Sequence, residues 1–185
     1  MDQLLESLAL LQKRLREASI PSAVIGGVAL SVWGEPRMTR DVDVKVSVGR
    51  DEAIRLLDAL GDEYIALSDD PLQTLSHFGF LFVKDRWDTR LDLLLAETEF
   101  DREVIRRAYA LEVVPGVVVD VCSAEDLVIY KLISTRLRDH EDAASVIRRQ
   151  GDALDDAYVL DWLRRFEQAL DDSTLVAEYR RLRHI

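Results

Sequence analysis

The chain has 185 residues and a formal net charge of −11, and 48% of its residues are hydrophobic. This length suggests one domain, or one domain with a helical appendage, and the acidity argues against a broad surface that coats nucleic acid. The single cysteine, Cys122, excludes an intrachain disulfide and argues against a cysteine-based zinc site. No apolar run approaches the roughly 18 residues of a membrane span, and the N-terminus lacks the charge order of a secretory signal, so we expect a cytoplasmic protein.

The N-terminal two-thirds alternates between helical and strand patterns. Leucines at helical spacing predict a helix over residues 2–19. A short apolar run at 22–25 predicts a buried strand, and the pair Gly26–Gly27 then makes a turn into a helix. Acids alternating with valines predict a strand over 41–48. The helix after the glycine pair is expected at 28–34. After the strand at 41–48 we expect a helix at 51–61, a strand at 63–67, a loop at 68–77 and strands at 78–85 and 89–96. A helix at 99–109 and two short strands about the Pro-Gly turn of 113–121 follow.

From Ser123 onward every pattern is helical. The expected helices cover residues 124–137, 140–150, 155–170 and 173–182. We therefore predict an α+β fold, in which a mixed sheet flanked by helices is followed by a helical C-terminal third. The change of pattern predicts two domains, 1–122 and 123–185.

Three acids point to a metal site. On a strand, Asp41 and Asp43 share one face, and two neighbouring carboxylates repel unless a cation neutralises them. Carboxylate oxygens suit a hard ion such as Mg²⁺. Asp92 stands alone among leucines on a later strand, and if the two strands are neighbours it completes a site of the kind used for phosphoryl displacement. In the alternative, Asp92 caps a turn or pairs with Arg90 or Arg86.

The glycine pair suggests a phosphate site. A glycine turn lets the backbone approach a phosphate closely, and the helix that follows offers unpaired N–H groups and the positive end of its dipole. Taken alone, Gly26 and Gly27 are more simply a turn, and an Asp-x-Asp pair is more simply a solvated sheet edge. Their joint order with Asp92 favours a site.

These residues resemble the signature of the nucleotidyltransferase superfamily related to DNA polymerase β: a glycine pair, about ten to thirteen residues, Asp-x-Asp and a later strand acid. The run "GEPRMTRDVDV" also resembles the Arg-x-Thr-x-Asp-x-Asp form of AbiEii-like toxins and of some aminoglycoside nucleotidyltransferases, with Arg37 and Thr39 at the first two positions. The resemblance implies a nucleotidyltransferase-type mixed sheet.

A second stretch, "EDLVIYKLISTRLRDHEDAASVI", resembles another segment of AbiEii-like proteins. The matching residues are Asp126, Lys131, Arg136, Arg138, Asp139 and Asp142. On one continuous helix, Lys131 and Arg138 would share a polar stripe that faces a cleft and meets a triphosphate. In the alternative, the stripe is a solvated surface and Asp139 caps the next helix.

Together these features predict a metal-dependent nucleotidyltransferase that moves a nucleoside monophosphate from a nucleoside triphosphate to a hydroxyl acceptor. Asp41, Asp43 and Asp92 would be catalytic and would hold Mg²⁺ or Mn²⁺. The expected nucleotide-binding residues are Gly26, Gly27, Arg37, Thr39, Lys131, Arg138 and Asp139. The AbiEii-like resemblance implies an RNA acceptor such as tRNA, and a toxin with an antitoxin partner. The alternatives are a small-molecule acceptor of the aminoglycoside type, which the acidic chain suits electrostatically, and a non-catalytic nucleotide- or partner-binding protein.

Overall fold

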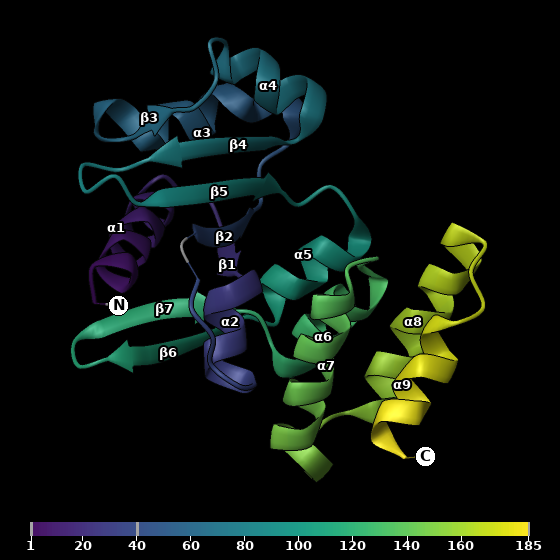
Figure 1. Cartoon of the computed structure of the whole chain (residues 1–185). Coiled ribbons are helices and arrows are strands. Elements are labelled where there is room, and N and C mark those ends of the chain that lie inside the picture. The colour runs from purple at the N-terminus through teal and green to yellow at the C-terminus, as the bar shows by residue number, and fades with distance from the viewer. Residues whose placement is uncertain (1, 40, 185) are drawn as a thin grey trace. The chain divides into compact units, whose positions relative to one another are not determined.

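A computed structural model describes residues 2–39 and 41–184 of the chain. Its contacts divide into two compact units (Figure 1). The first combines the chain up to Val28 with Met38–Cys122, and the second combines Ala29–Arg37 with the chain from Ser123 onward. Helix α2 (Gly26–Trp33) begins in the first unit and continues into the second. The domains expected at 1–122 and 123–185 stay a prediction.

A mixed sheet forms the centre of the first unit. Within the described residues it has seven strands in the order β3-β4-β5-β2-β1-β7-β6. Strand β2 runs parallel to β5 and antiparallel to β1, and β4 runs antiparallel to β5. The strands are β1 (Ser22–Val24), β2 (Asp41–Val46), β3 (Ile65–Ala66), β4 (Phe80–Lys84), β5 (Arg90–Leu95), β6 (Tyr109–Val114) and β7 (Val117–Val121).

The alternation of acids and valines decides how β2 sits in the sheet. Val42, Val44 and Val46 are fully buried, whereas Asp41 and Asp43 on the other face are partly exposed. Leu91 and Leu93 of β5 are buried beside these valines. One face of the sheet therefore belongs to the hydrophobic core, and the other carries the acids.

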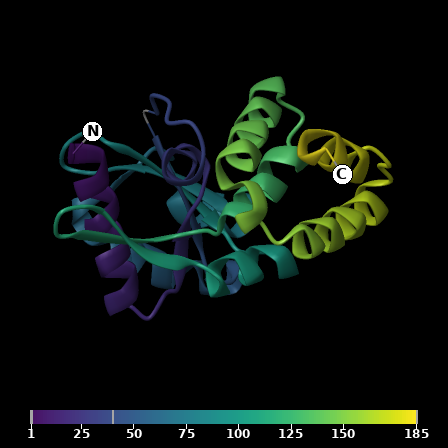
Figure 2. The ribbon, with the colours of Figure 1, turned by 90° about the horizontal axis from the view of Figure 1, so that it is seen from below.

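Helices of the first unit cover this sheet. They are α1 (Asp2–Glu17), α3 (Ala53–Leu60), α4 (Pro71–Phe78) and α5 (Glu99–Arg106). Helix α1 packs against β7, as Figure 2 shows, and buries Leu8, Leu11 and Leu15 completely. Those leucines are the helical stripe that predicted this element.

The predicted loop over residues 68–77 is wrong, because α4 occupies most of it. The Asp70 side chain accepts a hydrogen bond from the backbone N–H of Gln73 and so caps the helix, while Pro71 occupies its first turn. Gly79, at φ +72°, ends it in the left-handed conformation. A capping aspartate followed by proline is a helix start signal, and here it lies in a segment too polar to show a clear apolar stripe.

The second unit consists of helices. Beside the later part of α2 these are α6 (Ala124–Ile133), α7 (Leu137–Gln150), α8 (Asp156–Leu170) and α9 (Leu175–Arg183). Helix α9 lies along α8 in both views of the molecule (Figures 1 and 2). The guanidinium of Arg183 joins them through two 2.8 Å bonds to the Asp156 carboxylate, which also accepts a hydrogen bond from the Tyr179 hydroxyl.

The single helix predicted over 124–137 is also wrong. Helix α6 ends at Ile133, Ser134 adopts an extended conformation with ψ 143°, and α7 begins at Leu137. In other respects the predicted α+β fold, a mixed sheet with flanking helices and a helical C-terminal region, is confirmed. No helix in the described part of the chain combines the length and the apolar character of a membrane span.

Candidate active site

The two acid-bearing strands lie side by side in the first unit. Strands β2 and β5 are parallel, and their register pairs Asp43 directly with Asp92 and Asp41 with Arg90. Directly paired residues of neighbouring strands point to the same face of a sheet, and alternate residues along a strand share a face. The expected adjacency of the two strands is therefore confirmed, and Asp41, Asp43 and Asp92 share the face opposite the valine core.

Asp92 is paired with a cation of its own strand. The Arg90 guanidinium donates from Nε and Nη2 to the two carboxylate oxygens of Asp92, at 2.6 and 2.9 Å. This hydrogen bond, with the nearby charges of Asp92, Asp41 and Asp43, raises the pKa of Arg90. The Arg90–Asp92 pair, which was the alternative interpretation of the sequence, is thus present. Asp92 also lies beside Asp43, as expected.

The carboxylates suit a hard divalent cation in their chemistry. Asp41 and Asp43 supply two oxygen-donor side chains on one strand face, and Mg²⁺ commonly takes one or two protein carboxylates and completes its shell with water and phosphate oxygens. Within the described residues, no group of three or more His, Cys, Asp or Glu side chains is arranged to hold a metal ion. The donor set therefore fits an ion on Asp41 and Asp43. Both oxygens of Asp92 accept hydrogen bonds from Arg90, and the expected role of Asp92 as a third metal ligand stays a prediction.

Gly26 is required by the position of Asp43. Its φ is +63°, and an added Cβ would lie 2.7 Å from Cγ of Asp43 and closer still to Oδ2. The neighbouring backbone is tied to the same residue, because the Ile25 N–H donates to the Asp43 carbonyl at 2.9 Å. The absence of a side chain at residue 26 thus lets the Asp43 carboxylate lie against the start of α2.

Gly27 has the same relationship to Thr39. A Cβ at Gly27 would lie 2.7 Å from the Thr39 hydroxyl oxygen. That hydroxyl lies 3.1 Å from both the backbone carbonyl oxygen and Oδ1 of Asp41, to which it donates. The two glycines and Thr39 therefore hold the first turn of α2 close to the two acids of β2.

A salt bridge that the sequence did not indicate lies further along the same face. Lys45, two residues after Asp43 on β2, places its ammonium 2.7 Å from the carboxylate of Asp101 on α5. Both side chains are largely buried. The pairing joins residues from separate elements, so local sequence patterns gave no signal for it.

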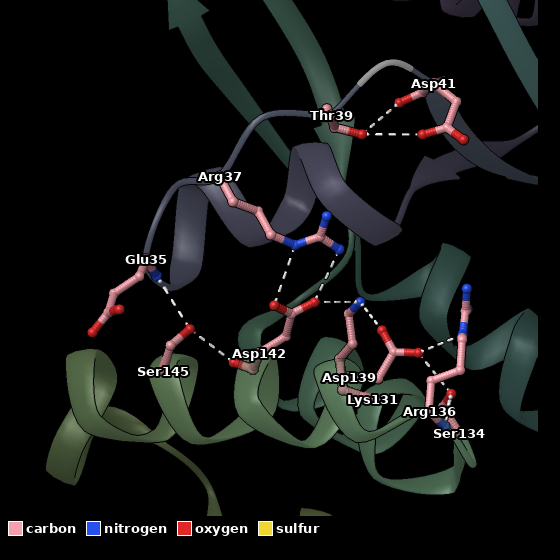
Figure 3. A network of polar contacts seen from close by, with 10 residues as sticks. All are labelled: Glu35, Arg37, Thr39, Asp41, Lys131, Ser134, Arg136, Asp139, Asp142 and Ser145. Atoms are coloured by element: carbon pink, nitrogen blue, oxygen red, sulfur yellow. Dashed lines mark hydrogen bonds and ion pairs between the residues drawn. The ribbon is translucent and has the colours of Figure 1, made fainter.

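The second unit contains a separate cluster of buried charges (Figure 3). Lys131 on α6 is only 7% exposed, and its ammonium lies 2.5 Å from Asp139 and 2.8 Å from Asp142, both on α7. The Ser134 hydroxyl donates to Asp139 at 2.6 Å. Arg37 donates from Nε and Nη2 to the two oxygens of Asp142, at 3.2 and 3.1 Å. We call Arg37, Lys131, Asp139 and Asp142 the charge cluster.

Burial opposes ionisation of Asp139, but the hydrogen bonds from Lys131 and Ser134, with the charges of Lys131 and Arg136, outweigh it. The pKa of Asp139 is therefore lowered. The carboxylate is ionised at neutral pH, and it neutralises part of the positive charge of Lys131.

The geometry expected for Lys131 is consequently wrong. Because the helix ends at Ile133, Lys131 and Arg138 belong to different helices and form no common stripe. Lys131 is committed to two carboxylates, whereas Arg138 is exposed. The nucleotide-binding roles of Lys131, Arg138 and Asp139 stay predictions, and so does that of Arg37, whose side chain is 29% exposed.

Comparison with known proteins identifies the fold. No protein-family model matches the sequence, and no curated protein matches it. Among solved structures, a crystal structure of ANT(2'')-Ia in complex with adenylyl-2''-tobramycin matches with a TM-score of 0.58 and 16% identity, over 90% of this chain and 99% of that one. An antigenic nucleotidyltransferase-like protein from Paracoccidioides brasiliensis matches with a TM-score of 0.55 and 17% identity, over 95% and 97%.

The chain has the nucleotidyltransferase fold. A third structure, the lincomycin-bound lincosamide antibiotic adenylyltransferase LnuA, agrees with a TM-score of 0.52 at 13% identity, over 76% of this chain and 94% of that one. At these identities the likeness establishes the fold alone.

Proposed function

We propose that the protein is a metal-dependent nucleotidyltransferase that transfers a nucleoside monophosphate from a nucleoside triphosphate to a hydroxyl group, with pyrophosphate as the leaving group. The observation that supports this most strongly is the direct pairing of Asp43 with Asp92 on one sheet face, with Gly26 against Asp43. We call Asp41, Asp43 and Asp92 the acid face. Phosphoryl transfer depends on positioning and on neutralising charge, and the acid face beside the N-terminus of α2 suits both requirements.

Each residue of the acid face, and each of the residues that surround it, has a proposed role. Asp41 and Asp43 would hold Mg²⁺ or Mn²⁺, which supplies the positive charge that a transferring phosphoryl group needs. Thr39 would keep the Asp41 carboxylate oriented, since its hydroxyl donates to Oδ1. Gly26, Gly27 and the first N–H groups of α2 would bind the distal phosphates. Asp92, held in place by Arg90, would accept the proton of the attacking hydroxyl at a carboxylate oxygen.

The charge cluster would contribute phosphate contacts from Arg37. Its Nε and Nη2 are held by Asp142, which Lys131 in turn anchors, so the guanidinium is fixed in orientation while its side chain keeps some exposure. A planar guanidinium suits phosphate oxygens. On this proposal, Lys131 and Asp139 act on the nucleotide through the position of Arg37, and Arg138 contributes from the exposed surface of α7.

The net charge of −11 favours a small acceptor that is neutral or cationic over a polyanion. A small-molecule acceptor is therefore our first choice. An RNA acceptor such as tRNA, with an antitoxin protein as partner, is the second, and it rests on the resemblance of Arg37, Thr39, Asp41 and Asp43 to the AbiEii-like form.

The test is incubation of the purified protein with each labelled nucleoside triphosphate, Mg²⁺ or Mn²⁺, and separate pools of small hydroxyl compounds, aminoglycosides and tRNA. We expect metal-dependent transfer of label to a small-molecule pool. Transfer to tRNA alone would favour the second choice. Nucleotide binding without transfer to any pool would favour the non-catalytic alternative.

A further inference from the structure

Three phenyl rings form a row, two of them on β4 and the third at the end of α4, two residues before β4 begins. The ring centroids of Phe80 and Phe82 are 4.9 Å apart, with an interplanar angle of 27°, which is a stacked arrangement. Phe78, the last residue of α4, continues the row at 6.0 Å from Phe80, with an angle of 36°. We call Phe78, Phe80 and Phe82 the phenyl row.

The phenyl row is continuous with the acid face. Phe82 is the direct partner of Asp92 in the antiparallel pair of β4 and β5, so both side chains point to the same side of the sheet. The Arg90 guanidinium, which holds Asp92, also lies over the Phe82 ring at 4.3 Å from its centroid. One arginine therefore links the proposed base to the aromatic row.

The two ends of the phenyl row differ. Arg90 covers Phe82 at one end, whereas Phe78 at the other end is 65% exposed. The ring of His77 is tilted by 50° to that of Phe78 at 6.4 Å and does not continue the stack. Aromatic rings prefer offset-stacked or edge-to-face neighbours, so the exposed phenyl of Phe78 offers a stacking position to another planar ring.

The order of the strands indicates which substrate lies over the row. Across the sheet the order is β4, β5, β2, β1, which means the phenyl row, then Asp92, then Asp41 and Asp43, then Gly26 and Gly27 at the start of α2, which follows β1. In an in-line displacement the attacking and leaving oxygens lie on opposite sides of the phosphorus. If the leaving phosphates bind at Gly26 and Gly27, the acceptor approaches from the side of β5 and β4.

We infer that the acceptor is an elongated small molecule with no net negative charge, which stacks a planar aromatic ring on Phe78 and directs a hydroxyl toward Asp92. This inference rests on the proposed function. It selects a small molecule because the row adjoins three carboxylates in a chain of net charge −11, which repels the phosphates of a nucleic acid. It also disfavours saturated polycations, which have no planar aromatic ring to stack on Phe78.

The experiment uses two probes with the same sugar hydroxyls, benzyl β-glucoside and methyl β-glucoside, and an oligoribonucleotide with an unpaired 3′ adenosine. Saturation-transfer NMR on the full chain measures ring binding without any requirement for turnover. The variants are Phe78→Ala, Phe78→Tyr and, as a control, Tyr109→Ala. Tyr109 is an aromatic residue that is 50% exposed on β6, at the opposite edge of the sheet.

We expect the benzyl protons to receive saturation from the wild-type protein and the methyl glucoside to receive little. Phe78→Ala should weaken benzyl binding by roughly two- to tenfold, Phe78→Tyr should retain it, and Tyr109→Ala should have no effect. Equal binding of the two glucosides, or equal loss in Phe78→Ala and Tyr109→Ala, would overturn the inference. Tighter binding of the oligoribonucleotide than of benzyl β-glucoside at the phenyl row would overturn the choice of a small molecule.

A transfer assay separates this inference from the proposed function. If the wild-type protein transfers label but Phe78→Ala leaves the acceptor KM unchanged, the ring site is wrong and the proposed function stands. If the ring binds at Phe78 but no labelled nucleotide is transferred to any acceptor, the proposed function fails. We expect the KM for the nucleoside triphosphate to be the same in the wild-type protein and in Phe78→Ala.

Discussion

The carboxylate of Asp43 occupies the space that a side chain at residue 26 would need. Gly26→Ala should therefore abolish nucleotide transfer, because the new methyl group displaces Asp43 from the acid face. A suitable control is Gly116→Ala, since Gly116 also has a positive φ, of +80°, but no atom within 4 Å of its added Cβ. Both variants should lose about 1–2 kcal/mol of unfolding free energy from backbone strain. Only Gly26→Ala should lose transfer, and retained activity in that variant would contradict the proposed contact.

Arg90 is expected to position Asp92. Arg90→Gln removes the two hydrogen bonds that fix this carboxylate, and a small misplacement of a catalytic group can cost about 10²-fold in rate. We expect the transfer rate to fall by that order, while the KM for the nucleoside triphosphate changes little. Arg86→Gln is the control, because Arg86 lies over the Trp87 ring and not on Asp92. Equal rates for the two variants would show that Arg90 has no positioning role.

The charge cluster predicts a strong effect on stability. Lys131→Met leaves Asp139 and Asp142 buried without their shared ammonium, and breaking a buried ion pair on one side costs about 3–5 kcal/mol. Arg136→Ala removes a different cation, which lies 2.9 Å from the Asp139 carboxylate, but the Arg136 side chain is 83% exposed. Denaturant unfolding should therefore show a large loss for Lys131→Met and little change for Arg136→Ala. Similar losses of unfolding free energy in the two variants would mean that the buried contacts of Lys131 with Asp139 and Asp142 do not stabilise the packing of α6 against α7.

The lowered pKa of Asp139 gives a sign for the dependence of stability on pH. Because this pKa is lower in the folded state than in the unfolded chain, the stabilisation is present above the unfolded value of about 3.9 and is lost as the pH falls through the folded value. The unfolding free energy of the wild type should thus decline more steeply below about pH 4 than that of Asp139→Asn. Parallel declines would contradict the assignment.

The arrangement of the acid face was predictable because its signals are local. Alternating acids and valines fix which face of β2 is buried, and a lone acid between leucines does the same for Asp92 on β5. Once the strands are neighbours, Asp43 and Asp92 must share a face. The need for glycine at residue 26 followed from a general property of phosphate-binding turns, whereas the contact with Asp43 that enforces it became visible only in three dimensions.

The charge cluster and the phenyl row were not predictable in this way. Lys131 falls on what looks like a continuous helix, and only its partners on α7 and the break at Ser134 turn it into a buried residue. The phenylalanines at 78, 80 and 82 alternate as in any strand, so their stacking and the covering of Phe82 by Arg90 depend on tertiary contacts. Propensity and periodicity do not report such contacts.

The most direct test of the proposed chemistry is the rate of labelled nucleotide transfer by Asp43→Asn, compared with the wild type and with Asp58→Asn, an exposed carboxylate on α3. The asparagine keeps the shape of the side chain and removes the charge that would hold a divalent cation. We predict that Asp43→Asn unfolds at the same denaturant concentration as the wild type and transfers no nucleotide at any Mg²⁺ or Mn²⁺ concentration, while Asp58→Asn is fully active. Transfer by Asp43→Asn at the wild-type rate would contradict the account.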